Sequence, residues 1–462
     1  MHHPAPSWPE ASPQTASPVV THRRILALAL PMTLANVTTP LLGLVGTAAV
    51  GRLGDAALLG ALALGAVAFD YLFWTFGALR MATAGLTAQA TGAGDGDEID
   101  LALARALAVA LAVGLAMVVA QGPLGAAAFR LFGASPAVTE ALAAYFAVRI
   151  WCAPFTLANY AILGSTLGRG RTDLGLGLQV AINAVNVGLT LLFVLGLGAG
   201  VAGAALATVL AEIAGTALGL FGLHRLGSRP WRVPVSEIVE RSGLARMLSV
   251  NGDVMVRTLA LITALALFTG LGARAGDVTL AANAVLQNLF LIGSFFLDGF
   301  ATAAEVLCGQ ALGARDEGAF RGAVRLCLGW CLGFALVVSG LFLGVGGPFI
   351  DAITTAPDVR AFARDYLVYA ALTPLAAAAA FAFDGVYIGA TWTRAMRNLM
   401  LAALAIDAAT LAATRELGNT GLWLAMLTFL AARGLGQAAL YPRLAAGAFP
   451  QPRVGPLMEA AR

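Results

Sequence analysis

The sequence predicts an all-α membrane protein with twelve transmembrane helices, arranged as two pseudo-symmetric six-helix bundles. Composition, the spacing of apolar runs and an internal repeat support this prediction. Of the 462 residues, 59% are hydrophobic and 11% are charged, and the mean hydropathy is +0.82. A soluble domain carries roughly 25% charged residues, so this chain has too few charges to cover a surface that faces water. Lipid is therefore the expected solvent.

A helix needs about 20 apolar residues to cross the hydrocarbon core of a bilayer. Runs of this kind are expected at Ile25–Val50, Ala57–Leu79, Leu101–Ala120, Val138–Leu163, Leu174–Leu195, Val201–Leu223, Leu248–Leu271, Leu280–Ala301, Leu326–Val345, Tyr366–Ile388, Leu399–Ala413 and Leu422–Leu440. Arg is concentrated in the loops on the side of the two termini, and cytoplasmic loops carry the excess of positive charge. We therefore expect both termini in the cytoplasm.

An internal repeat divides the chain near its middle. The motif Gln89-Ala-Thr-Gly-Ala-Gly-Asp95 recurs as Gln310-Ala-Leu-Gly-Ala-Arg-Asp316, at an offset of 221 residues (310 − 89). Six runs lie on each side of the polar segment 224–246, so the two units are parallel repeats that can tip against each other in alternating access. The expected organisation is a disordered cytoplasmic tail (1–22), an N-lobe (23–223), a cytoplasmic linker (224–246), a C-lobe (247–445) and a second cytoplasmic tail (446–462).

Ionisable residues within the apolar runs are candidates for function, because each one costs at least about 2.5–3.5 kcal/mol at bilayer depth unless it faces a cavity or a partner. Asp253 and Arg257 lie four residues apart on the seventh run. Asp298 and Glu305 lie seven residues apart on the eighth run, and Asp384 lies in the tenth. We expect these side chains to converge on a proton, cation or substrate site. The alternative is a structural salt bridge between Asp253 and Arg257.

Amides dominate the polar positions of the first half. Asn36 lies in the first run, and Gln179, Asn183 and Asn186 share one face of the fifth. Such amides either join helices or donate hydrogen bonds to a substrate in a cavity.

Several other classes of protein are disfavoured. The net charge is only +3, and the basic residues, all of them Arg, are spread over short loops, so no nucleic-acid partner is expected. The four cysteines lie inside apolar runs, and the four histidines lie in the N-terminal tail and the central loop. No metal site, disulfide framework or catalytic constellation is therefore predicted, and we expect a carrier without enzyme activity or a bound cofactor.

Several motifs resemble the DinF-like branch of the multidrug and toxic compound extrusion (MATE) family. They lie at Pro40–Leu53, Gly85–Ala90, Asn283–Leu286, Leu297–Phe300, Gly309–Asp316, Asp384–Gly389 and Met396–Asn398, and the resemblance covers roughly residues 22–445. It implies a MATE-like exporter that uses an inward H⁺ or Na⁺ gradient to extrude organic, often cationic or amphipathic, compounds. We expect a monomer in the bacterial inner membrane, whose partners are the small-molecule substrate, the coupling ion and lipid.

The chain departs from the family pattern in the N-lobe. Family members usually carry an Asp in the first helix, where this chain has Gly46, and often an Asp in the fifth helix, where it has Thr190. Neither residue can titrate. Coupling has therefore moved to the C-lobe acids Asp253, Asp298 and Asp384, or the protein is an uncoupled facilitator, or coupling is lost. A further alternative is a lipid-precursor flippase of similar fold, which should show a strongly cationic cavity.

Overall fold

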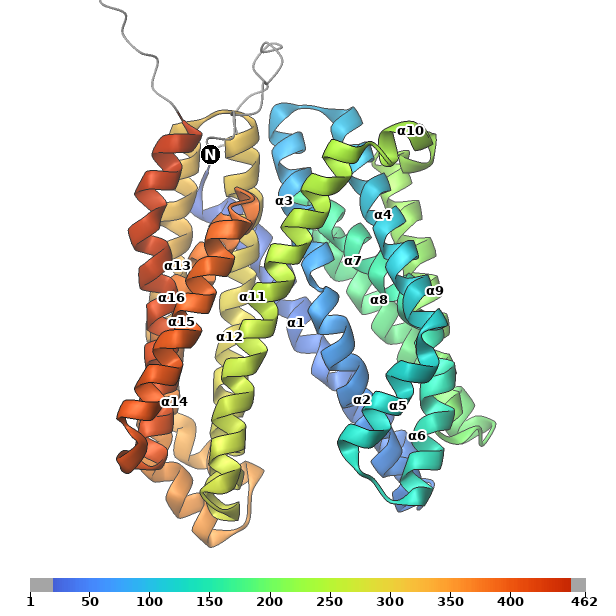
Figure 1. Ribbon diagram of the computed structural model, residues 1–462, viewed down its shortest axis with the longest axis vertical. Helices are drawn as coiled ribbons and strands as arrows, with labels where there is room; N and C mark the ends of the chain where they lie inside the picture. The colour runs from blue at the N-terminus through green and yellow to red at the C-terminus, as the bar shows by residue number, and fades with distance from the viewer. Residues whose placement is uncertain (1–19, 450–462) are drawn as a thin grey trace, which may run out of the picture.

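The computed structural model describes residues 20–449, apart from the side chains of residues 39–42. The chain is helical throughout this region, with no β-strand (Figure 1). Twelve helical segments are long and apolar enough to cross a membrane, which confirms the predicted class. The tails expected at 1–22 and 446–462 lie largely outside the described residues.

The N-lobe contains six spans. Its second span is built from α2 and α3, its fourth from α6, a 3₁₀ turn and α7, and its fifth from α8 and a π-helical turn, while a short helix, α5, was not expected from the sequence. The N-lobe elements are α1 (His22–Gly51), α2 (Ala56–Phe76), α3 (Ala78–Ala93), α4 (Gly96–Val119), α5 (Gln121–Phe132), α6 (Pro136–Arg149), η1 (Ile150–Cys152), α7 (Ala153–Gly168), α8 (Thr172–Thr190), η2 (Leu191–Gly196) and α9 (Gly200–Arg225).

The C-lobe contains the other six spans, one helix each. A short connection with η3 (Pro230–Arg232) and α10 (Val235–Ile238) leads into it. Its elements are α11 (Arg241–Arg274), α12 (Asp277–Gly313), α13 (Glu317–Ile353), α14 (Pro357–Gly389), α15 (Thr393–Ala413), η4 (Arg415–Leu417) and α16 (Asn419–Ala448). The shortest predicted span, Leu399–Ala413, lies within α15.

The two lobes contact each other at one end of the molecule and diverge toward the other (Figure 1). We call the first the terminal end, because α1 begins and α16 ends there, and the second the far end. Helix α12 of the C-lobe packs against α1 and α3 of the N-lobe, and α11 also reaches α3. The interface between the lobes is therefore built mainly on α12.

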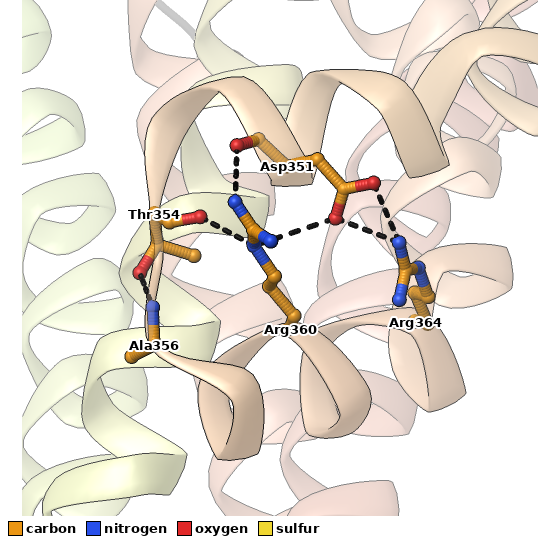
Figure 2. A network of polar contacts seen from close by, with 5 residues as sticks. All are labelled: Asp351, Thr354, Ala356, Arg360 and Arg364. Carbon is orange, nitrogen blue, oxygen red and sulfur yellow. Dashed lines mark hydrogen bonds and ion pairs between the residues drawn. The ribbon is translucent and has the colours of Figure 1, made fainter.

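At the far end, two arginines organise the turn between α13 and α14 (Figure 2). Arg360 donates to the backbone carbonyls of Thr354 and Asp351, at 2.6 and 2.8 Å. Arg364 Nη2 contacts both carboxylate oxygens of Asp351 at 2.6 Å. The last carbonyls of a helix lack helical partners, so the guanidinium group of Arg360 caps α13. The positive charges of both arginines complement the dipole at this end of the helix.

Candidate functional site

The repeated motif forms the contact between the lobes at the terminal end. Gly92 of α3 lies against Gln310 of α12, and Gly313 of α12 lies against Gln89 of α3. A Cβ atom built on either glycine would lie 1.9 Å from the glutamine carbonyl oxygen opposite, so no other residue fits without separating the helices. We call these four residues the glutamine–glycine contact. It relates the two lobes by the same offset of 221 residues as the sequence repeat (313 − 92).

The two glutamine side chains extend this symmetry. Gln89 Nε2 donates to the carbonyl of Gly389 in the C-lobe at 2.9 Å, and Gln310 Nε2 donates to the carbonyl of Gly168 in the N-lobe at 3.1 Å. Arg24 of α1 donates to Gln310 Oε1 at 3.1 Å. Each glutamine therefore satisfies a carbonyl at a helix end of the opposite lobe, where the helix itself provides no donor.

Two carboxylates of α12 face the N-lobe between this contact and the middle of the helix. Asn36 Nδ2 of α1 donates to Asp298 Oδ2 at 2.9 Å. Arg80 Nη1 of α3 lies 3.9 Å from Glu305 Oε2. The Glu305 side chain is 3% exposed, and its second oxygen, Oε1, has no hydrogen-bond partner among the described residues. The predicted spacing on one face of the eighth span thus places both acids at the interface between the lobes.

A small cavity lies at this interface. Its volume is about 170 Å³. Its lining residues are Met32, Ala35, Asn36, Arg80, Leu163, Gly175, Gln179 and Asp298. The N-lobe supplies two amides and one guanidinium group, and the C-lobe supplies one carboxylate. We call it the interlobe cavity.

Inside the C-lobe, Asp384 of α14 is held by three side chains. Its Oδ2 contacts Arg257 of α11 and, at 2.8 Å, Arg433 of α16, while its Oδ1 accepts from Gln437 at 2.7 Å. All four residues are buried. These residues, which we call the C-lobe ion cluster, join three helices through one anion and two cations, so the cluster carries one net positive charge.

Asp253 bonds to α15 instead of to Arg257. Its Oδ1 accepts from Arg397 Nη1 at 2.5 Å, and its Oδ2 accepts from Thr393 at 3.1 Å. The salt bridge between Asp253 and Arg257 considered from the sequence is therefore wrong. Their spacing places both residues on one face of α11, but Arg257 pairs with Asp384 of α14, and Asp253 pairs with Arg397 of α15.

In the N-lobe, the predicted amides form two separate sets of neutral hydrogen bonds. Gln179 donates to Asn183 at 3.2 Å, Asn183 donates to Thr38 at 3.2 Å, and the Thr190 hydroxyl donates to Asn186 at 3.1 Å. At the position where the family resemblance predicts a carboxylate, the hydroxyl of Thr190 thus has a local partner.

The position of Gly46 has room for a side chain. A Cβ atom there would meet nothing within 4 Å. The missing carboxylate of the first helix is thus not excluded by packing.

The N-lobe still holds a carboxylate within its spans. Asn159 Nδ2 donates to Glu212 Oε2 at 2.7 Å, and the hydroxyl of Thr216 donates to Asn159 Oδ1 at 3.1 Å. This group lies between α7 and α9, within the N-lobe.

Sequence reasoning gave no role to Arg80, Arg397, Arg433 or Gln437, although each one binds a predicted site acid. Arg433 carried the clearest signal, because it is an Arg near the middle of an apolar span and is 4% exposed. Arg397 was counted only as a loop charge, and Gln437 has no sequence feature that sets it apart.

Among the described residues, no group of three or more His, Cys, Asp and Glu side chains could hold a metal ion. The four cysteines, Cys152, Cys308, Cys327 and Cys331, are buried and free. The interface between the lobes is joined by an ion pair and a hydrogen bond to the two acids of α12.

Comparisons with known proteins agree with this architecture. The MatE family profile matches residues 31–192 and 254–412, one segment in each lobe. The DNA damage-inducible protein F of Escherichia coli (strain K12) is 38% identical over 417 residues, which cover 90% of this chain and 91% of that protein.

Solved structures show the same fold. The crystal structure of a MATE protein in the bent conformation superposes with a TM-score of 0.84 at 19% identity, covering 92% of this chain and 95% of that one. An outward-facing multidrug resistance MATE family transporter of the MOP superfamily superposes with a TM-score of 0.81 at 19% identity, covering 92% and 96%. The twelve spans, the duplicated lobes and these matches together show that the chain belongs to the MATE family, in its DinF-like branch.

Proposed function

We propose that this protein is a secondary active transporter that exports organic, cationic or amphipathic compounds by alternating access, in exchange for H⁺ or Na⁺. The observation that carries the proposal is the placement of Asp298 and Glu305. Both acids lie on α12 and bond to the N-lobe, through Asn36 and Arg80. An ion taken up by these carboxylates competes with their N-lobe partners, so ion binding and separation of the lobes are linked.

Asp298 and Glu305 are better placed for coupling than the other acids of the C-lobe. Asp384 is bound by two guanidinium groups of its own lobe, and Asp253 is paired with Arg397. An ion bound at either of these acids changes contacts within one lobe only. An ion bound at Asp298 or Glu305 changes a contact between the two lobes.

The interlobe cavity argues against the flippase alternative. It contains one arginine and one carboxylate, so it has no net positive charge to attract a phosphate-bearing precursor. The facilitator alternative, suggested by Gly46 and Thr190, predicts that no ion gradient drives transport.

We also propose that the protein is a monomer in the bacterial inner membrane, with the terminal end in the cytoplasm. The excess of Arg in the loops of that end supports this orientation. The structure then has its lobes in contact on the cytoplasmic side. Labelling of single cysteines, introduced at each end, with a membrane-impermeant thiol reagent in intact cells tests the orientation.

Transport is tested with the purified protein in proteoliposomes. The uptake of a fluorescent cationic dye is measured under an imposed pH gradient, an imposed Na⁺ gradient, or neither. The Asp298→Asn, Glu305→Gln double variant is measured beside the parent. Asp351→Asn is the matched control, because it removes an ion-paired carboxylate at the far end, away from the contact between the lobes.

We expect one of the two gradients to drive uptake in the parent and in the control, and the double variant to lose this dependence. The gradient that works identifies the ion. Uptake without gradient dependence in the parent would mean a facilitator. If uptake by the double variant still depends on the gradient, the coupling ion binds at Asp253 or Asp384 instead.

A further inference from the structure

A second, larger cavity lies within the C-lobe, on a different part of the molecule from the interlobe cavity. Its volume is about 700 Å³, and it is bounded by the first turns of α11, the start of α15 and the end of α16. Toward the terminal end, α11 leans away from α15 and α16 toward the N-lobe (Figure 1), where it packs on α3. This divergence leaves space between the helices near the terminal end, and in the proposed orientation this space lies at the level of the cytoplasmic headgroups.

The polar part of the cavity carries excess positive charge. Arg246 of α11 and Arg394 of α15 line it, and both are exposed. Neither makes a hydrogen bond or an ion pair with the described residues, although Arg246 interacts electrostatically with Glu98 of α4. The one acid in the lining, Asp253, is already paired with Arg397.

Helix α15 adds to this potential. It begins at Thr393, its N-cap residue is Trp392, and no side chain caps its first N–H groups. The N-terminus of a helix carries a partial positive charge, so its dipole acts in the same direction as the two arginines.

The remaining walls are mostly apolar. Leu399 of α15 and Leu440 and Leu444 of α16 line the same cavity. A free inorganic anion would make no use of these walls, whereas an amphiphile with a charged head and an acyl chain matches both parts. Basic pockets between transmembrane helices near the cytoplasmic surface bind anionic lipid headgroups by the same combination of forces.

We propose that this cavity binds an anionic phospholipid, with the phosphate against Arg246 and Arg394 and an acyl chain along Leu399, Leu440 and Leu444. The proposal is independent of the transported substrate. Its chemistry is opposite to that of the proposed cationic cargo, because the excess charge of the cavity is positive.

The proposal is tested by native mass spectrometry of the purified full-length protein in detergent. The probes are dioleoyl phosphatidylglycerol, dioleoyl phosphatidylcholine and inorganic phosphate. The Arg246→Gln, Arg394→Gln double variant removes the headgroup contacts. The control is the Arg274→Gln, Arg415→Gln double variant, which removes the same amount of charge from two exposed arginines at the far end. Thermal unfolding of each form checks that the variants are folded as well as the parent.

We expect the parent and the control to retain phosphatidylglycerol in preference to phosphatidylcholine, and the double variant to bind phosphatidylglycerol about tenfold or more weakly, since each basic residue near an anionic headgroup contributes roughly 1 kcal/mol. Equal retention of the two lipids by the parent, or an unchanged preference in the double variant, would overturn the proposal. Displacement of the lipid by equimolar inorganic phosphate would overturn the lipid assignment and leave a free-phosphate site.

Discussion

At two equivalent positions of the two lobes, the N-lobe carries an amide where the C-lobe carries an ionisable residue. At the offset of 221 residues, Asn36 corresponds to Arg257 (257 − 36), and Asn186 corresponds to Asp407 (407 − 186). The glutamine–glycine contact, in contrast, is the same in both lobes. The duplicated unit has thus kept the residues that join the lobes, while the polar residues inside each lobe have diverged. Both halves therefore contribute the same residues to the contact between the lobes, whereas the charges inside each lobe differ: the C-lobe has the ion cluster around Asp384, and the N-lobe has Glu212 bonded to Asn159.

The largest expected effect comes from the symmetric part. In the Gly92→Ala, Gly313→Ala double variant, each new methyl group would lie 1.9 Å from a carbonyl oxygen of the other lobe. The lobes cannot then close at the terminal end, so we expect transport to be abolished and the terminal end to stay open. Dye transport in proteoliposomes and thiol labelling of a cysteine introduced at this interface measure the two effects.

The matched control is Gly222→Ala, Gly322→Ala. Both glycines lie in helices, and a Cβ atom on either would meet nothing within 4 Å, so transport should be unchanged and stability equal or slightly higher, because Ala favours a helix over Gly by about 0.8–1 kcal/mol. Normal transport by the Gly92, Gly313 variant would show that the close contact is not part of the cycle.

The second prediction concerns the C-lobe ion cluster. Asp384→Asn leaves Arg257 and Arg433 buried without their anion, so we expect a loss of about 3–5 kcal/mol in the free energy of unfolding. Arg257→Gln should cost less, because the pair between Asp384 and Arg433 remains. Denaturant unfolding in detergent measures both variants.

An N-lobe variant provides the comparison. Asn183→Ala removes the hydrogen bond to Thr38 on α1 and the one from Gln179 within α8, and hydrogen bonds between membrane helices contribute about 0.6 kcal/mol each on average. Equal losses for Asp384→Asn and Arg257→Gln would contradict the view that a single anion holds two cations in this cluster.

The spans were predictable, because a chain in lipid must satisfy its backbone within each helix and so shows long apolar runs. The ends of the helices that form the contact between the lobes were not predictable in the same way. The eighth run was expected to end at Ala301, but α12 continues to Gly313, because its last turns are covered by the N-lobe and do not need apolar side chains facing lipid. The second span continues to Ala93 for the same reason.

The membership of the candidate site was partly predictable. Asp298 and Asp384 could be named from their depth in apolar runs, and Glu305, which lies beyond the expected end of the eighth run, from its spacing of seven residues from Asp298. The partners of these acids could not be predicted, because Arg80 and Arg433 contact them from other helices. The spacing of residues within one helix does not show which other helix packs against it. The exchange of partners by Asp253 and Arg257 has the same cause, because a favourable spacing within α11 was outweighed by residues of α14 and α15.

The smallest expected effect on transport comes from adding to the N-lobe the two acids that the family resemblance leads us to expect there. Thr190→Asp places a carboxylate at a position that is 3% exposed, where Thr190 now bonds to the amide of Asn186, so we expect a loss of up to about 2.5–3.5 kcal/mol in the free energy of unfolding. Gly46→Asp should cost less, because nothing lies within 4 Å of its Cβ position. We expect the Gly46→Asp, Thr190→Asp double variant to show a steeper dependence of dye uptake on the pH gradient than the parent, because two further acids can then bind protons. The control is the Gly46→Asn, Thr190→Asn variant, which adds side chains of similar size that cannot titrate and should behave like the parent. An unchanged dependence would mean that the C-lobe acids alone determine coupling in this chain, and that the amides of the N-lobe serve packing.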